Sequence, residues 1–307
     1  MKLAIPDKIS PSYFIAEAAV ELGFFKAEGL EVTLELIYPV DKAYEALRDG
    51  AIDFVGGAAH AVLSAFPDFK GAKLIAAQSQ GMYWFLVMRA DLGAKRGDLS
   101  VVKGRTIGAA PWVNTGLRGL LNAAGIDLDR DKVTIAPVPG ILGTVPNFGV
   151  MAARAVQDGK LDGFWANGMG AEVAVREGFG TLIADVRRGD GPKACFNYTE
   201  PTIATTDALI ARSPDTVAAA VRAIVKTQAA LKQDVSRAGE VGKRLFPAEE
   251  AALIVELIRR DLPFYDATIS REFIAGMTAF LRSQNILKND VAYEQIVATQ
   301  FAPLWKG

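Results

Sequence analysis

The sequence predicts an α/β protein of two similar lobes, built on two mixed, mostly parallel sheets and followed by a helical C-terminal tail. The first observation is a near-repeat: residues 46–54 are matched 109 positions later (155 minus 46) by residues 155–163. In both copies a helix ends on glycine and a buried strand follows at once. The second is the alternation of strand and helix patterns, which is typical of parallel sheets. The third is that the chain after Ser213 shows helical patterning alone.

The elements of the first half follow from apolar spacing and turn residues. Ser10 can cap a helix and Pro11 suits its first position, after which apolar residues keep helical spacing up to Gly23. Further helices are expected at residues 41–48 and 58–66. The expected strands are residues 2–6, 31–38, 52–55 and 72–77.

Residues 86–88 are expected to carry the chain into the second lobe. Strands are expected there at 105–110, 132–137, 163–166 and 181–186, and helices at about 115–124, 148–158 and 169–177. The loop 140–147 is eight residues longer than its counterpart in the first lobe (offsets of 109 and 101). A return strand at 201–210 leads to the tail helices 217–231, 238–245, 249–262, 270–284 and 292–301. We expect this tail to pack on the first lobe.

These elements predict one lobe from residues 1–87 plus 206–307, a second lobe from residues 88–205, and a ligand cleft between them. Half of the residues are apolar and the net charge is −1, so neither a nucleic-acid partner nor an anionic membrane surface is indicated. No apolar stretch is long enough to embed the chain in a membrane. We expect a monomer that takes a small-molecule ligand.

Several chemistries have no support in the sequence. One histidine and one cysteine cannot build a zinc site of usual composition, so no metal is expected. No nucleophile elbow and no phosphate loop occurs, and no cofactor is expected. Gly168 and Gly170 echo a dinucleotide fingerprint whose third glycine is missing. No secretory signal is visible, so the protein is expected in the cytoplasm if the sequence is complete, and in the periplasm if a leader was removed.

Candidate binding residues come from the predicted carboxyl ends of strands, where ligands of open α/β sheets bind. The small-residue runs 56–60 and 165–169 occupy that position in both lobes. Tryptophans near these ends offer flat walls to an aromatic ligand, with core packing as the alternative. Helix N-termini attract anions, with ordinary capping as the alternative. The candidate ligand-binding residues are Ser10, Ser12, Tyr13, Gly57, Ala58, His60, Gln78, Trp84, Trp112, Asn114, Thr115, Trp165, Asn167 and Tyr198.

His60 is the only histidine of the chain. Its imidazole could donate a hydrogen bond to a ligand or act as a general base. The alternative is a helix start without chemistry. No catalytic partner pattern accompanies it, and no catalytic residue is assigned.

Four segments in order resemble one family: residues 16–32, 46–55, 103–108 and 158–165. They resemble the type II periplasmic solute-binding proteins, and more narrowly the alkanesulfonate-type and thiamine-precursor-type (NMT/THI-like) receptors of ABC transporters. The resemblance implies two lobes joined by two crossovers that close by a hinge over a small organic solute. The tryptophans and the helix N-termini favour an aromatic or N-heterocyclic, anionic solute. The resemblance adds sulfonates, nitrate-like anions and pyrimidine precursors as alternatives, and the partner it implies is an ABC permease. Because the same fold hosts enzymes, the alternative is a cytoplasmic enzyme for a pyrimidine-like substrate with His60 as acid or base.

Overall fold

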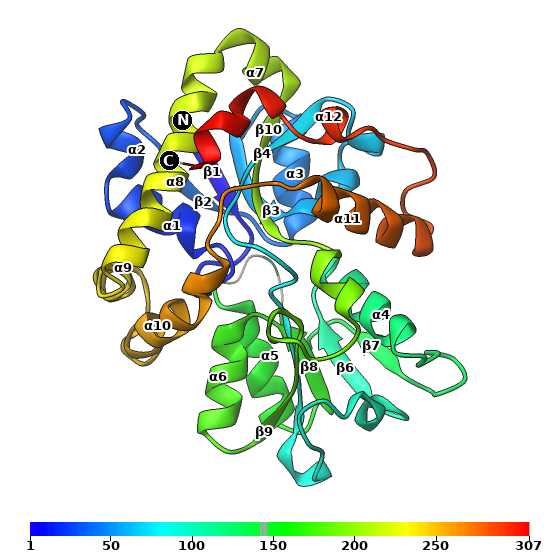
Figure 1. Ribbon diagram of the computed structural model, residues 1–307. Helices are drawn as coiled ribbons and strands as arrows, with labels where there is room; N and C mark the ends of the chain where they lie inside the picture. Colours follow the sequence, from blue (N-terminus) through cyan, green and yellow to red (C-terminus); the bar gives the residue numbers. More distant parts are fainter. Residues whose placement is uncertain (142, 144–145, 307) are drawn as a thin grey trace.

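The computed structural model describes residues 1–141, 143 and 146–306, and its strands form two five-stranded sheets surrounded by helices (Figure 1). The first sheet has the order β2-β1-β3-β10-β4 and the second the order β7-β6-β8-β5-β9. The first sheet contains β1 (Lys2–Ile5), β2 (Thr33–Leu36), β3 (Phe54–Ala58), β4 (Ala72–Ala77) and β10 (Pro201–Thr206). The second contains β5 (Phe85–Arg89), β6 (Thr106–Ala109), β7 (Thr134–Ala136), β8 (Gly163–Ala166) and β9 (Gly180–Asp185).

The two sheets share one plan. In each, the second strand of the order, β1 or β6, pairs in parallel with both of its neighbours. In each, one antiparallel strand is also inserted between two others: β10 between β3 and β4, and β5 between β8 and β9. The repeated segments place β3 and β8 at equivalent positions, starting at Phe54 and Gly163. The predicted two-lobed fold with two mixed sheets is therefore confirmed.

Helices pack around both sheets and form the tail. The first lobe and the tail contain α1 (Phe14–Glu21), α2 (Phe24–Ala27), α3 (Val40–Arg48), α7 (Asp207–Arg212), α8 (Pro214–Gln233), α9 (Arg237–Leu245), α10 (Ala248–Asp261), α11 (Arg271–Ser283) and α12 (Tyr293–Ile296). The second lobe contains α4 (Val113–Ala123), α5 (Phe148–Gln157) and α6 (Gly168–Arg176). The helix expected at 58–66 is a shorter 3₁₀ helix, Ala59–Ser64, and it begins one residue later because β3 runs on through Ala58. None of the helices in the described part of the chain is long and apolar enough to cross a membrane.

The small residues at the end of β3 allow α3 to pack closely on the sheet. A Cβ on Gly57 would lie 3.0 Å from the hydroxyl of Tyr44 and 3.1 Å from a methyl group of Val40. The Tyr44 hydroxyl donates a hydrogen bond to the carbonyl of Ala58 at 3.1 Å. The run of small residues that suggested a ligand loop therefore has a packing function here.

The glycine pair at the start of α6 also has a packing function. A Cβ on Gly170 would lie 2.1 Å from the carbonyl oxygen of Gly149 in α5. The backbones of α5 and α6 therefore approach each other more closely than any side chain would permit. This close packing explains why a glycine occupies position 170, and no dinucleotide-binding function is needed to explain it.

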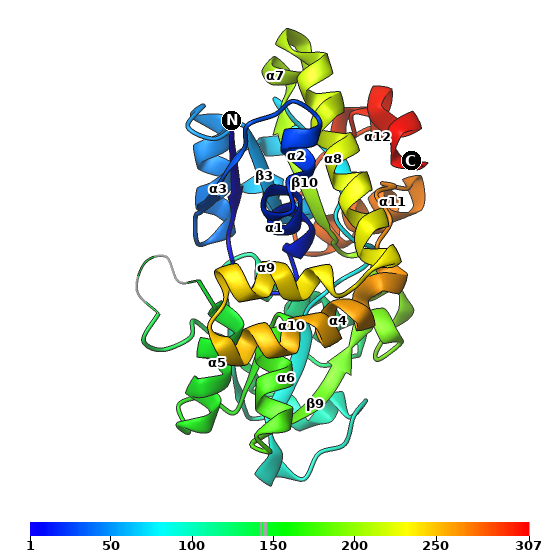
Figure 2. The same cartoon turned by 90° about the vertical axis from the view of Figure 1, so that its left-hand side faces the viewer.

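The tail reaches both lobes. In Figure 2, α9 lies beside α1 of the first lobe and α10 lies beside α6 of the second. Arg260 of α10 pairs with Glu172 of α6 at 2.9 Å, and Arg176 of α6 pairs with Glu256 of α10. The tail thus packs on the second lobe as well as on the first, where we expected it.

The predicted lobe boundaries, after residues 87 and 205, fall inside β5 and β10. All of β5 belongs to the second sheet and all of β10 to the first. We propose on this basis that the two crossovers between the lobes are residues 78–84 and 186–200.

Candidate functional site

A pocket lies between the two lobes, with about 400 Å³ of empty space when the open solvent at its mouth is included. Pro6 follows β1, and Pro111 occupies the corresponding place after β6. The carboxyl ends of parallel strands therefore meet here, as expected for ligand sites of α/β sheets. We call this the interlobe pocket. Its lining is Pro6, Asp7, Ser12, Tyr13, Tyr38, Val40, Trp84, Ala110, Pro111, Val113, Phe148, Ala166 and Asn167.

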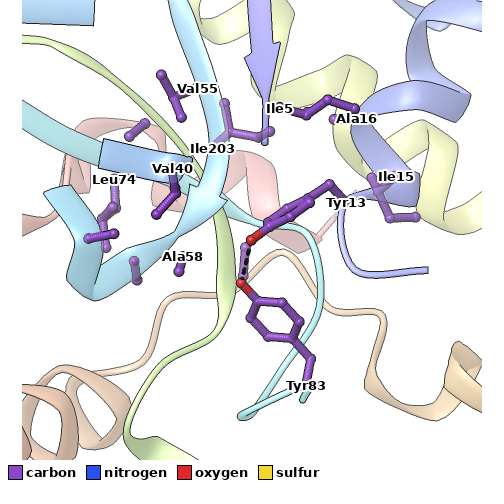
Figure 3. Close-up of a cluster of buried hydrophobic side chains, with 14 of the residues drawn as sticks. Ile5, Tyr13, Ile15, Ala16, Val40, Val55, Ala58, Leu74, Tyr83 and Ile203 are labelled. Atoms are coloured by element: carbon purple, nitrogen blue, oxygen red, sulfur yellow. Dashed lines mark hydrogen bonds between the residues drawn. The ribbon is translucent and has the colours of Figure 1, made fainter. Parts of the chain in front are cut away.

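Four aromatic rings from both lobes line the pocket, those of Tyr13, Tyr38, Trp84 and Phe148. Tyr38 of the first lobe stacks on Phe148 of the second, with ring centroids 5.7 Å apart and an interplanar angle of 23°. The hydroxyl groups of Tyr13 and Tyr83 are 2.8 Å apart and point toward one another (Figure 3). Trp84, directly before β5, also lines the pocket. Such walls suit a flat, largely apolar ligand.

Asp7 is the charged residue of the lining, and it joins the lobes. Its Oδ1 accepts a hydrogen bond from the backbone N–H of Phe148 at 3.2 Å, and its Oδ2 accepts one from the side-chain amide of Asn167. Asp7 is buried, and burial raises the pKa of its carboxyl to about 7 against the lowering effect of these hydrogen bonds. Asp7 is therefore a carboxyl in a poorly hydrated, partly apolar pocket.

Asn167 is fixed by the helix that it caps. Its Oδ1 accepts hydrogen bonds from the N–H groups of Met169 at 2.9 Å and Gly170 at 3.3 Å. The amide nitrogen must then face Asp7. The start of α6 thus orients the donor that crosses the cleft.

A second set of hydrogen bonds joins the lobes at the rim of the cleft. The N–H groups of Lys8 and Ile9 donate to the carbonyl of Pro146 at 3.0 and 2.6 Å. Pro146 belongs to the loop 140–147, which the sequence marked as longer in the second lobe. Residues 142, 144 and 145 of that loop lie outside the described residues.

His60 joins the first lobe to the second away from the interlobe pocket. Its Nε2 lies 3.0 Å from the carbonyl of Trp112, and its Nδ1 lies 2.9 Å from the hydroxyl of Thr199. Because a carbonyl only accepts, Nε2 carries the proton and Nδ1 accepts from Thr199. Burial lowers the pKa of His60 to about 4, so the ring is neutral at physiological pH. Both nitrogens are occupied, and neither faces the pocket as a base.

The three tryptophans near strand ends have different surroundings. Trp84 lines the pocket, whereas Trp165 is fully buried and donates from Nε1 to the carbonyl of Val113 at 3.1 Å. The ring of Trp165 lies 6.2 Å from that of Trp84, edge to face, and supports it. Trp112 begins α4 with φ +65°, and its ring lies 5.8 Å from that of His60.

Of the residues proposed from the sequence, Ser12, Tyr13, Trp84 and Asn167 come together in the lining. Ser10 lies directly behind it and accepts from the N–H of Ser12 at 3.0 Å. The others, outside the lining, are Gly57 and Ala58 in β3, His60, Gln78, Trp112, Asn114 and Thr115 in α4, Trp165 and Tyr198.

Two of these outlying residues make contacts that explain their position. The side chain of Gln78 accepts from the N–H of Ala16 at 3.1 Å and donates to the carbonyl of Thr202 at 3.3 Å, which ties α1 to β10. Tyr198 stacks on Phe280 of α11, with ring centroids 4.2 Å apart.

The sequence patterns did not point to Asp7, Tyr38 or Phe148, which line the pocket. One signal could have found Asp7: it lies just after the end of β1, where an open α/β sheet binds its ligand. In the described part of the chain, no group of three or more His, Cys, Asp or Glu side chains could hold a metal ion.

A two-lobed α/β chain with a pocket between the carboxyl ends of its strands has the architecture of the periplasmic solute-binding proteins. The family model described as "NMT1/THI5 like" matches residues 11–237. The protein belongs to this family.

The chain is similar to several known proteins. It is 24% identical to the riboflavin-binding protein RibY of Chloroflexus aurantiacus, over 97% of this chain and 84% of that protein. A protein of Bordetella bronchiseptica RB50 superposes with a TM-score of 0.77 and 21% identity, over 98% of this chain and 95% of the other. The alkanesulfonate-binding protein SsuA of Xanthomonas axonopodis pv. citri, bound to MOPS, superposes with a TM-score of 0.69 and 14% identity, over 98% and 97%. These structural likenesses show the fold.

Proposed function

We propose that this protein binds a small aromatic organic solute in the interlobe pocket and delivers it to an ABC-type importer. The observation that carries the proposal is that both lobes supply the walls of one pocket, with Tyr38 stacked on Phe148 across it. A solute between these walls would hold the lobes together. Membership of the NMT1/THI5-like family supports this function, as does the relative named for riboflavin, which is an aromatic N-heterocycle.

The mechanism is capture by closure. Rings from both lobes remove apolar surface of the solute from water, and the polar groups of Asp7, Ser12 and Asn167 orient its edge. Two short crossovers permit a hinge motion that opens and closes the pocket. Binding then shifts the population toward the closed form, because the closed form alone presents both walls.

The test is a thermal-shift screen over flavins, pyrimidines, aromatic carboxamides, aromatic carboxylates and sulfonates. A solute that binds should raise the melting temperature progressively with its concentration. The same solute should lower the radius of gyration measured by small-angle X-ray scattering. If no solute class stabilises the protein, or if binding leaves the radius unchanged, the proposal is contradicted.

The proposed delivery step requires a permease as the partner and a location outside the membrane that contains it. The loaded protein should act as a monomer at the outer face of the membrane, which in a cell with two membranes is the periplasm. In vesicles that contain the cognate permease, the solute-loaded protein should stimulate ATP hydrolysis. Equal stimulation by the solute-free protein would contradict a function in delivery.

A further inference from the structure

We propose that Asp7 makes the interlobe pocket selective by charge: it accepts uncharged or cationic aromatic solutes that carry an N–H donor, and it rejects anionic ones. This inference rests on the proposed solute-binding function and departs from the anionic solute that the sequence led us to expect.

The charge of the lining favours solutes that are not anionic. Asp7 is an acid, and no lysine, arginine or histidine lines the interlobe pocket among the residues that the structure describes. Its carboxyl accepts hydrogen bonds from two donors and forms no ion pair with a described residue. A second negative charge in this desolvated pocket would face like-charge repulsion without a cation to offset it.

Protein acceptors already occupy N–H groups at three of the helix N-termini around the pocket, those of α4, α5 and α6. At the start of α5, Asp7 accepts from the N–H of Phe148, and at the start of α6, Asn167 accepts from two N–H groups. At the start of α4, the N–H of Asn114 donates to the carbonyl of Ala110 at 3.0 Å. These are the groups that would otherwise bind an anion.

Two polar side chains of the lining can still form hydrogen bonds with a solute. The Oγ of Ser12 is buried in the lining and has no hydrogen-bond partner among the described residues. A carboxylate accepts at more positions than its two present donors fill, so Asp7 can accept a further N–H. A planar solute with an N–H at its edge would satisfy Asp7, and a polar atom beside it would pair with Ser12.

The test uses pairs of solutes that have nearly the same shape and differ in charge: nicotinamide and nicotinate, benzamide and benzoate, and indole-3-acetamide and indole-3-acetate. Dissociation constants are measured by calorimetry at about pH 8, where Asp7 is mostly ionised. The amide of a pair should bind at least about tenfold more tightly than the acid. In the Asp7→Asn variant, the ratio of the dissociation constant of the acid to that of its amide should fall. The variant should also bind the acid more tightly than the unmodified protein does. Such a gain of affinity cannot come from misfolding.

Asp290→Asn is the matched control, because it removes the same charge from a side chain that is 98% exposed. It should leave the ratio unchanged. Acids that bind the unmodified protein as tightly as their amides would overturn charge selectivity and would still support solute binding. Failure of every amide to bind would also overturn the inference, and the broader screen would then decide separately whether any solute binds. An Asp7→Asn variant that does not fold would leave the ratio in the unmodified protein as the deciding measurement.

Discussion

Replacing Asp7 by asparagine should change how the free energy of unfolding depends on pH. Burial raises the pKa of the Asp7 carboxyl from 3.8 to about 7 in the folded protein. Between these two values the folded chain holds more protons than the unfolded chain. The contribution of Asp7 to stability is therefore fully present below about pH 4 and is lost as the pH rises toward 7 and above.

A shift of about three pKa units corresponds to about 4 kcal/mol. Asparagine does not titrate. Between about pH 4 and pH 8, the free energy of unfolding of Asp7→Asn should therefore rise by about 4 kcal/mol relative to that of the unmodified protein. His60 has the opposite sign, since its lowered pKa adds stability as the pH rises from about 4 to 6.5. Its contribution cancels in the difference between the two proteins.

The assay is urea unfolding followed by tryptophan fluorescence at a series of pH values across this range. The control variant Asp290→Asn removes an equal charge from the surface, and its curve should parallel that of the unmodified protein. If the Asp7→Asn curve also ran parallel, within about 1 kcal/mol, Asp7 would not be the desolvated carboxyl that the geometry indicates.

Three further substitutions test the packing and the pocket. Gly170→Ala should destabilise the protein by about 3 kcal/mol or more, because the new Cβ would meet the carbonyl of Gly149 at 2.1 Å and backbone cannot move aside. His60→Ala should lower the free energy of unfolding by about 2–4 kcal/mol and weaken solute binding, since it leaves two buried groups unpaired and removes a bond between the lobes. Trp84→Leu should weaken binding of an aromatic solute by about tenfold or more, because its ring lines the pocket. Urea unfolding and calorimetry measure these effects.

Each of these predictions has a result that would contradict it. Gly239→Ala in α9 is the control for Gly170→Ala, because its Cβ would meet one methyl group of Val255 at 3.1 Å; equal effects of the two would contradict the argument from backbone contact. Unchanged stability in His60→Ala would exclude its role in joining the lobes. If Trp84→Leu left the affinity for the solute unchanged and Trp165→Ala lowered it markedly, Trp165 and not Trp84 would be the ring that contacts the solute.

The sequence predicted the fold well because the same local pattern occurs in both lobes. The repeat at residues 46–54 and 155–163 encodes the same helix, glycine and buried strand in each lobe, and local patterning alone specifies these. The 3₁₀ helix at Ala59–Ser64 was expected as a longer helix, because apolar spacing over so short a segment does not separate a 3₁₀ helix from an α-helix.

The pocket was harder to predict than the fold. Ser12, Tyr13, Trp84 and Asn167 could be proposed from their places near strand or helix ends. Tyr38 and Phe148 could not, because each matters only when the lobes meet and the two rings stack. The run from Gly56 to His60 looked like a ligand loop, yet its glycines serve helix packing and its histidine joins the lobes.

The most direct test of the central claim is a crystal structure of the protein with the tightest-binding solute from the screen. We predict that the aromatic ring of the solute contacts Tyr38, Phe148 and Trp84, with a solute N–H within hydrogen-bond distance of an Asp7 carboxyl oxygen. A solute held on the outer surface of one lobe, with the interlobe pocket vacant, would contradict it.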